Sequence, residues 1–323
     1  MVNCIDIKEN KIIEIDPSIL KILLKDNSSN DNIIWATDDY SFLGDGYAFN
    51  NHITIDLITG KNGNIIRPRV EKTKEQQTLR SRNKAEVFTP SWVCNIQNNL
   101  IDNAWFGRSN IFNIEDGEKW RIIDSPIVFP NEKKWQDYVK EQRLEITCGE
   151  APYLVSRYDT VTGKYIPVIE RIGLLDRKMR VVAENTDNEN DWYLWANKAF
   201  KSVFGFDWQG DNVLLARENL LYSFIDYYEN KFKKDPSKKY LIEIATILSW
   251  NIWQMDGLKF VIPKSCHVEN IIEHTLFGEI SHEQECEGCK NNVVTKHNGI
   301  YSYIMDWDTG KSIKFVEVAN KNV

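Results

Sequence analysis

Apolar residues recur at helical spacing in three segments of the chain. The first opens at Thr89, a good N-cap residue, with Pro90 at the expected first helical position. The second, which follows Gly205, is the longest. The periodic positions of these two segments are Trp92, Val93, Ile96 and Leu100, then Val213, Leu214, Leu220, Leu221, Phe224 and Tyr228. The third, YLIEIATILSW at residues 240–250, predicts a further helix.

Short apolar runs that end in an acid or a glycine alternate with these helices. RLEITCGEAPYLVSRY, residues 143–158, predicts a strand that ends in a tight turn of the kind that meets a nucleotide-type ligand. A second run ends at Gly205-Phe206-Asp207, and NIWQMDGL, residues 251–258, predicts a short strand that ends in an acid. The alternation favours an α/β fold with a parallel or mostly parallel sheet and a ligand at the carboxyl ends of its strands.

Period-2 apolar patterns occur near both ends of the chain. Residues 50–66 predict a hairpin around a Gly-Lys-Asn-Gly turn, and IYSYIMDWDTGKSIKFVEV near the end predicts another around Asp-Thr-Gly-Lys. The chain then divides into a β-rich extension with a basic segment (1–84), an α/β domain (85–262) and a small Cys/His-containing β region (263–323).

The overall charge excludes a generally basic nucleic-acid coat, because 40 Lys and Arg face 47 Asp and Glu, a net charge of −7. Residues 67–84 differ from this background, since seven basic residues and two glutamates leave a local charge of +5. Such a segment is either a solvated face or a phosphate-contacting surface for DNA. Its basic residues are Arg67, Arg69, Lys72, Lys74, Arg80, Arg82 and Lys84.

The sequence predicts a cytoplasmic protein. It has no apolar run of about 18 residues that could span a membrane. Its first residues, MVNCIDIKENK, carry acids and lack the apolar core of a signal peptide. The six cysteines are then expected to be reduced thiols.

Residues 266–297 contain three of the six cysteines and four of the five histidines. Cys286-Glu-Gly-Cys289 is a knuckle of the type that supplies two ligands to zinc. The other two ligands are less clear, and the candidates are Cys266 or His267, His282 and His297; the preferred set is Cys286, Cys289, His297 and His282. Structural zinc, plain reduced cysteines and redox activity all remain open.

Taken in order, four motifs resemble those of the γ-type, N6-adenine DNA methyltransferases of restriction–modification systems, in particular proteins labelled restriction endonuclease subunit M. AEVFTPSWV resembles the first cofactor motif, and LEITCGEAPYL the main one, usually acid-Pro-x-Cys-Gly-x-Gly-x-Phe-Leu. GFDWQGDNVLLARENLL resembles the strand whose final acid binds ribose, with its helix, and NIWQMDGL the strand near the adenine ring. The resemblance covers roughly residues 30–320.

The resemblance implies a Rossmann-like class I fold and S-adenosylmethionine as cofactor. Thr89 and Pro90 would lie near its methionine end, Asp207 would accept from the ribose hydroxyls, and Asp256 from the adenine amino group. The turn that lines the cofactor would contain Glu145, Thr147, Cys148 and Gly149. The implied partners are DNA and a restriction or catalytic partner subunit.

Two departures from the family bear on activity. Ala151-Pro152 replaces the second glycine of the main motif. The chain also lacks the Asn/Asp-Pro-Pro-aromatic tetrapeptide that holds the flipped adenine in the family. Asp306-Trp307 is the weak stand-in. The chain is therefore either an active adenine-N6 methyltransferase subunit or a catalytically incomplete one that binds DNA or a partner; a nuclease is a third, weaker hypothesis.

Overall fold

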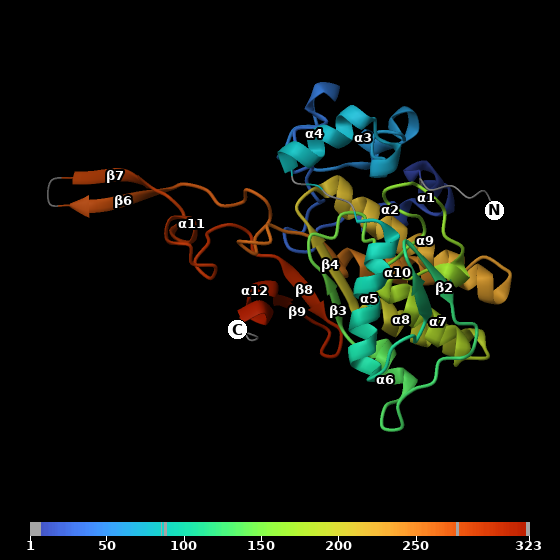
Figure 1. Ribbon diagram of the computed structural model, residues 1–323. Helices are drawn as coiled ribbons and strands as arrows, with labels where there is room; N and C mark the ends of the chain where they lie inside the picture. Colours follow the sequence, from blue (N-terminus) through green and yellow to red (C-terminus); the bar gives the residue numbers. More distant parts are fainter. Residues whose placement is uncertain (1–7, 85, 87–88, 276–277, 321–323) are drawn as a thin grey trace.

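The computed structural model describes residues 8–84, 86, 89–275 and 278–320 of the chain (Figure 1). Its N-terminal part is mainly helical, so the hairpin predicted over residues 50–66 is wrong. Ile53 and Ile58 are both buried; an odd spacing would put them on opposite faces of a single strand, whereas here a short helix over Ile55–Ile58 begins between them and redirects the chain. The helices here are α1 (Glu9–Ile15), α2 (Pro17–Leu24), α3 (Ile55–Ile58) and α4 (Lys74–Lys84).

A three-stranded parallel sheet forms the centre of the molecule. Its strands, in spatial order, are β3 (Arg143–Glu145), β4 (Val203–Asp207) and β5 (Ile252–Gln254). The helices between them are α7 (Leu174–Glu184), α8 (Glu189–Lys201), α9 (Gly210–Phe232) and α10 (Lys238–Asn251). The predicted parallel arrangement and the long helix after Asp207 are confirmed, while the methyltransferase fold stays a prediction.

The two faces of this sheet pack against different partners. Val203 and Ile252 belong to one large core with α7–α10, and this core also takes in Ile12 from the N-terminal helices. Phe206 and Trp253 point the other way, into a small cluster with Phe315 near the C-terminus. Because the strands follow one another in a single direction, right-handed crossovers place all four connecting helices on one face.

Before β3, α5 (Ser91–Phe106) leads to a hairpin of β1 (Asn113–Asp116) and β2 (Lys119–Ile122), and then to α6 (Trp135–Lys140). Pro90 is the N-cap of α5 rather than its first residue. Its φ of −56° suits a helix, but its ψ of 147° is extended, so the helix begins one position later than predicted.

The C-terminal part contains two hairpins. The first pairs β6 (Glu269–Thr275) with β7 (Gly278–Gln284) and is followed by α11 (Glu287–Asn291). The second, β8 (Tyr303–Asp306) with β9 (Lys311–Lys314), is the predicted Asp-Thr-Gly-Lys hairpin and leads into α12 (Phe315–Asn320). Within the described residues, no helix has the length and apolar character needed to cross a membrane.

Candidate functional site

Three carboxylates lie where the parallel strands end. Glu145 closes β3, Asp207 closes β4, and Asp256 lies two residues beyond β5. Since parallel strands point the same way, these residues share one side of the sheet, called here the carboxyl edge. The sequence analysis named all three, and the structure brings them to this edge.

The turn after β3 has an unusual backbone. Thr147, Gly149 and Ala151 have φ angles of 48°, 53° and 62°, in the left-handed region that favours glycine. Ala151 stands where the resembling family has its second glycine, and it adopts the conformation that a glycine would give. The positive φ of Ala151 is a backbone conformation that a side chain makes costly.

Hydrogen bonds join this turn to β4. The Cys148 amide donates to the Phe206 carbonyl at 2.8 Å, and the Gly149 amide donates to Oδ2 of Asp207 at 2.9 Å. Oδ1 of Asp207 accepts from the Gln209 amide at 3.0 Å and from the Asn212 side chain at 3.3 Å. A carboxylate has about four acceptor sites, so Asp207 retains capacity for one further donor.

Asp256 has a similar local role at the end of β5. Its Oδ1 accepts from the amides of Leu258 and Lys259 at 3.0 and 3.3 Å, which closes the turn that follows. Its other carboxylate oxygen is the one that a ligand donor would meet.

Glu145 is buried beneath the turn, where its two oxygens accept from the amides of Tyr153 and Leu154 at 3.3 and 3.1 Å. Burial raises the pKa of Glu145 to about 8, and the nearby Asp207 adds to the rise. At neutral pH, Glu145 is therefore mainly protonated, and it organises the turn without adding a second negative charge beside Asp207.

Replacement of Glu145 by glutamine is expected to flatten the pH dependence of stability. The folded state holds a proton that the unfolded chain releases above about pH 4.5. The stability from this proton is fully present below that pH and is lost as the pH rises through about 8, by at most about 1.4 kcal/mol per unit. Urea unfolding at about pH 5 and about pH 8 measures how much the free energy of unfolding of each protein falls between the two pH values. A fall of equal size in the native chain and in the variant would contradict the prediction.

The N-terminal part crosses the carboxyl edge. The Gly210 amide at the start of α9 donates to the Trp35 carbonyl at 3.1 Å, and the Trp208 indole donates to the Ala36 carbonyl at 3.0 Å. Gln254 at the end of β5 exchanges two hydrogen bonds of 2.9 Å with the backbone of Ile34. Residues 34–36 therefore pack directly against the carboxyl edge.

Thr89 and Pro90, predicted near the methionine end of the cofactor, lie beside the loop that follows the turn. The Thr89 carbonyl accepts from the Thr160 hydroxyl at 3.1 Å, and the Ser91 amide donates to Asp159 at 2.7 Å. Part of the motif that carries them, residues 85 and 87–88, lies outside the described residues.

The basic segment does not form one solvated face. Lys72 and Arg80 are buried and form ion pairs with Asp211, at 3.2 and 2.9 Å. Arg80 also pairs with Glu86. Both cations are thus neutralised by acids distant in sequence, which removes them from a role in contacting DNA phosphates.

The remaining basic residues of this segment differ in exposure. Lys74 and Arg82 are exposed on α4, whereas Arg67 is half-buried. Arg69 is half-buried too, and its guanidinium donates to the Glu86 carbonyl and the Ser81 hydroxyl at 2.7 Å. Among the basic residues of this segment whose side chains the structure describes, Lys74 and Arg82 are the two that are exposed and available to a phosphate.

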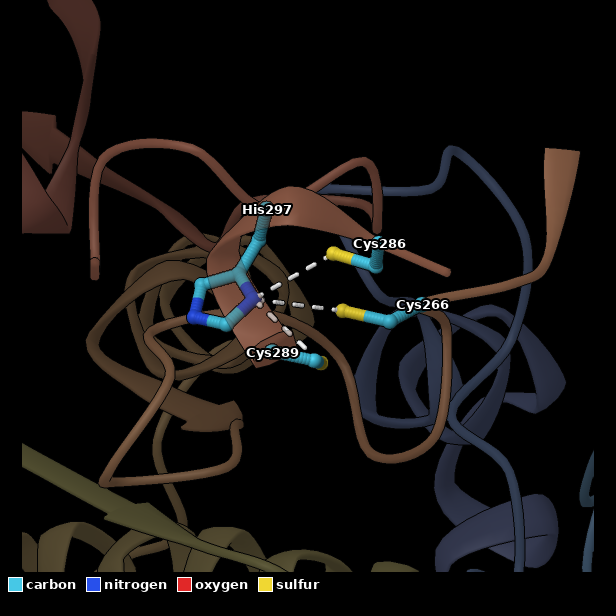
Figure 2. Close-up of side chains that lie close together, drawn as sticks. All are labelled: Cys266, Cys286, Cys289 and His297. Carbon is cyan, nitrogen blue, oxygen red and sulfur yellow. Dashed lines mark hydrogen bonds between the residues drawn. The ribbon is translucent and has the colours of Figure 1, made fainter. Parts of the chain in front are cut away.

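A separate group of ligand-type side chains lies near the base of β6 and β7. The sulfurs of Cys266, Cys286 and Cys289 are 3.5, 3.6 and 3.6 Å from Nδ1 of His297, and all four atoms lie within 4.8 Å of one another. Figure 2 shows the three thiols pointing toward the same side of the imidazole. This Cys₃His group could hold a metal ion.

The structure corrects one member of the predicted ligand set. His282 is an exposed residue of β7, opposite Ile271, and is not part of the group; Cys266 provides the fourth ligand instead. The reason is topological. Cys266 precedes β6 and Cys286 follows β7, so the antiparallel pairing brings the two ends of the hairpin together and carries His282 away from them.

Gly288, between the two cysteines of the knuckle, has a steric role. A Cβ atom at this position would lie 2.6 Å from Nδ1 of His297. The glycine therefore lets the imidazole approach the thiols closely.

The thiols differ in their acidity. Burial raises the pKa of Cys286, but hydrogen bonds from the Asn298 amide and His297 outweigh it and lower the pKa to about 6. Burial and the two neighbouring thiols raise the pKa of Cys266 to about 12. At neutral pH at least one sulfur is a thiolate, the form that binds metal ions.

Asp306 and Trp307, the candidates for the missing catalytic loop, lie far along the strands from the carboxyl edge. The Trp307 indole donates to Asn251, which precedes β5, at 2.8 Å, and Asp306 accepts from Thr309 within the β8–β9 turn. The structure thus places this pair at the amino ends of the strands, opposite Asp207 and Asp256.

No family model matches this chain, and neither does any curated protein or solved structure.

Proposed function

We propose that the carboxyl edge binds S-adenosylmethionine and that the chain is an adenine-N6 DNA methyltransferase subunit of a restriction–modification system. The observation that carries this proposal is the position of Glu145, Asp207 and Asp256 at the ends of three successive parallel strands. They accompany a left-handed turn at Gly149 and Ala151. Such systems act in the cytoplasm, the compartment that the sequence predicts.

The chemistry of the edge suits this cofactor. Unused acceptor sites on the carboxylates of Asp207 and Asp256 can accept from the ribose hydroxyls and the adenine amino group, while Gly149 in the turn lets the ligand approach the backbone. Transfer from the sulfonium to an amine needs no covalent intermediate with the protein, so positioning supplies most of the catalysis.

The Asp207→Asn variant tests the cofactor proposal. We expect calorimetry to show binding of S-adenosylmethionine by the native chain and affinity lower by about tenfold or more in the variant, because a charged acceptor for the ribose is lost. Asp306→Asn is the matched control and should bind as the native chain does. No heat of binding with the native protein would refute the proposal.

For DNA contact we propose the exposed Lys74 and Arg82 of α4. The target adenine must leave the base stack of the DNA duplex to reach the cofactor. Cations on a neighbouring helix of the protein can bind the DNA phosphates and hold the duplex in place.

A specific observation favours the second candidate, a catalytically incomplete subunit. The sequence has no Asn/Asp-Pro-Pro-aromatic tetrapeptide, and Asp306 and Trp307 lie at the wrong end of the strands. In the described part of the chain, no strand pairs with the outer side of β3, next to the turn. A partner that adds a strand there would bring its own residues beside the cofactor. Methyl transfer to DNA by the chain alone separates the two candidates.

We further propose that the Cys₃His group binds zinc in a structural role. Three thiols and one imidazole form a closed tetrahedral set that zinc favours, with no position left for water or substrate. The sulfur–nitrogen distances of 3.5–3.6 Å are those expected around one tetrahedral ion with bonds of about 2.0–2.3 Å.

A further inference from the structure

The β6–β7 hairpin projects from the rest of the molecule. Figure 1 shows β6 and β7 extending to the left, on the side where β8, β9 and α12 also lie; residues 267–285 are called here the arm, of which the structure describes 267–275 and 278–285. A two-stranded hairpin is marginally stable by itself in water. Val268 and Ile272 are nevertheless more than half exposed on the arm, at 54% and 55%. These two side chains therefore lack a packing surface within the described part of the chain.

The arm is strongly acidic. Residues 267–285 contain five glutamates and no lysine or arginine. Glu283 and Glu285 are exposed at the end of β7 and just beyond it. The Cys₃His group lies at the base, so both ends of the arm are held at a fixed point. The arm is thus an anchored, negatively charged and partly apolar projection.

The same side of the molecule carries a surface of opposite character. A groove of about 530 Å³ lies at the face of the sheet that packs against Phe315, with an apolar floor that includes Leu144, Phe204 and Trp253. Its basic residues are Lys140, Arg143, Lys198 and Lys201, and we call it the basic groove. Asp306 and Asp308 occupy another part of its lining.

The cations of the basic groove are largely unneutralised. Lys198 and Lys201 lie over the rings of Trp195 and Trp307, at 4.3 and 4.9 Å from the ring centroids. Of the four cations, Arg143 alone forms an ion pair with an acid within the described residues, Glu141 at 3.3 Å. In a chain with a net charge of −7, this is a site where an acidic segment would be attracted.

We propose that two copies of the chain exchange arms, each arm lying in the basic groove of the other copy. Charge complementarity selects this occupant: the arm offers glutamates and exposed aliphatic side chains, and the groove offers cations and an apolar floor. Because arm and groove share one side of the molecule, a two-fold axis on that side forms both contacts at once. The inference is independent of methyl transfer.

A charge-swap experiment on the full chain tests the exchange. Sedimentation analysis over a range of concentrations is expected to show a dimer for the native chain. The groove variant Lys198→Glu/Lys201→Glu and the arm variant Glu283→Lys/Glu285→Lys should each dissociate about tenfold or more readily, since like charges then face each other. Lys74→Glu/Arg82→Glu, which reverses two exposed cations on α4, is the matched control and should dimerise normally.

Mixing the two variants gives the decisive result. In the mixed dimer the reversed groove meets the reversed arm, and the native groove meets the native arm, so dimerisation should return. A native chain that stays monomeric, or variants that fail to pair with each other, would overturn the proposal. Duplex DNA binding that the groove variant loses, without any dimer of the native chain, would assign the groove to nucleic acid and also overturn it.

Discussion

Removal of the metal by a chelator is expected to disorder the region around α11 and the base of the arm while the parallel sheet stays folded. The four ligands come from three separate segments: Cys266 before β6, Cys286 and Cys289 at α11, and His297 in the loop beyond. Apart from the metal, little apolar burial holds these segments together, since both described core clusters lie elsewhere. Structural zinc in small modules contributes about 10–16 kcal/mol at neutral pH, more than this region can replace.

The measurement combines metal analysis with hydrogen exchange. The dialysed native chain should carry one zinc ion per chain, and the chelated chain should lose amide protection at residues 286–298 but keep it in β4 and α9. Cys289→Ser should lose the metal, whereas Cys94→Ser, a buried thiol outside the group, should keep it. A dialysed protein without metal and with full protection of residues 286–298 would rule out the zinc proposal.

The ends of the parallel strands could be predicted from the sequence because their signal is local. An apolar run followed by an acid identifies Asp207 and Asp256, and strand–helix alternation then places them on one side of a sheet. The spacing of Cys286 and Cys289 is also a local signal, and it identifies this pair as metal-ligand candidates. Cys266 could not be preferred over His282 in this way, because the choice depends on how the hairpin between them pairs.

The partners of the basic segment, residues 67–84, could not be predicted from the sequence. Seven cations in 18 residues indicate a solvated face or a phosphate contact, and nothing nearby in the sequence reveals that Asp211 lies beside two of them. Asp211 is 131 residues from Arg80 along the chain. One signal was available: Asp211 falls within the largely apolar start of α9, where an acid must find a partner when the helix is buried.

Replacement of Asp211 by alanine is expected to lower the free energy of unfolding by about 3–5 kcal/mol, the cost of leaving buried charges uncompensated. Asp211 is fully buried and accepts from the Tyr40 hydroxyl at 2.7 Å as well as pairing with Lys72 and Arg80. Burial raises the pKa of Asp211, but Arg80 and then Lys72 outweigh it and hold the pKa well below its usual range.

This depressed pKa fixes the pH range in which the network stabilises the chain. The contribution of Asp211 is present above the pKa of about 4 that the unfolded chain has, and it is lost as the pH falls below that value. Urea unfolding at neutral pH should therefore give a higher free energy of unfolding for the native chain than for Asp211→Ala. The difference between the two free energies should become smaller in acid. Asp39→Ala, which removes a more exposed partner of Arg80, is the control and should cost about 1 kcal/mol or less.

A compensating change identifies the cause of the loss. Lys72→Met in the Asp211→Ala background removes one of the two stranded cations while keeping a similar side-chain volume, so it should recover part of the lost stability. Arg80 keeps Glu86 as a partner in either background. If Asp211→Ala cost no more than Asp39→Ala, the buried ion pairs would not be what holds residues 67–84 against the start of α9. The attachment would then have to come from other contacts of this segment, such as the hydrogen bond of 2.6 Å from the Arg69 amide to Glu150.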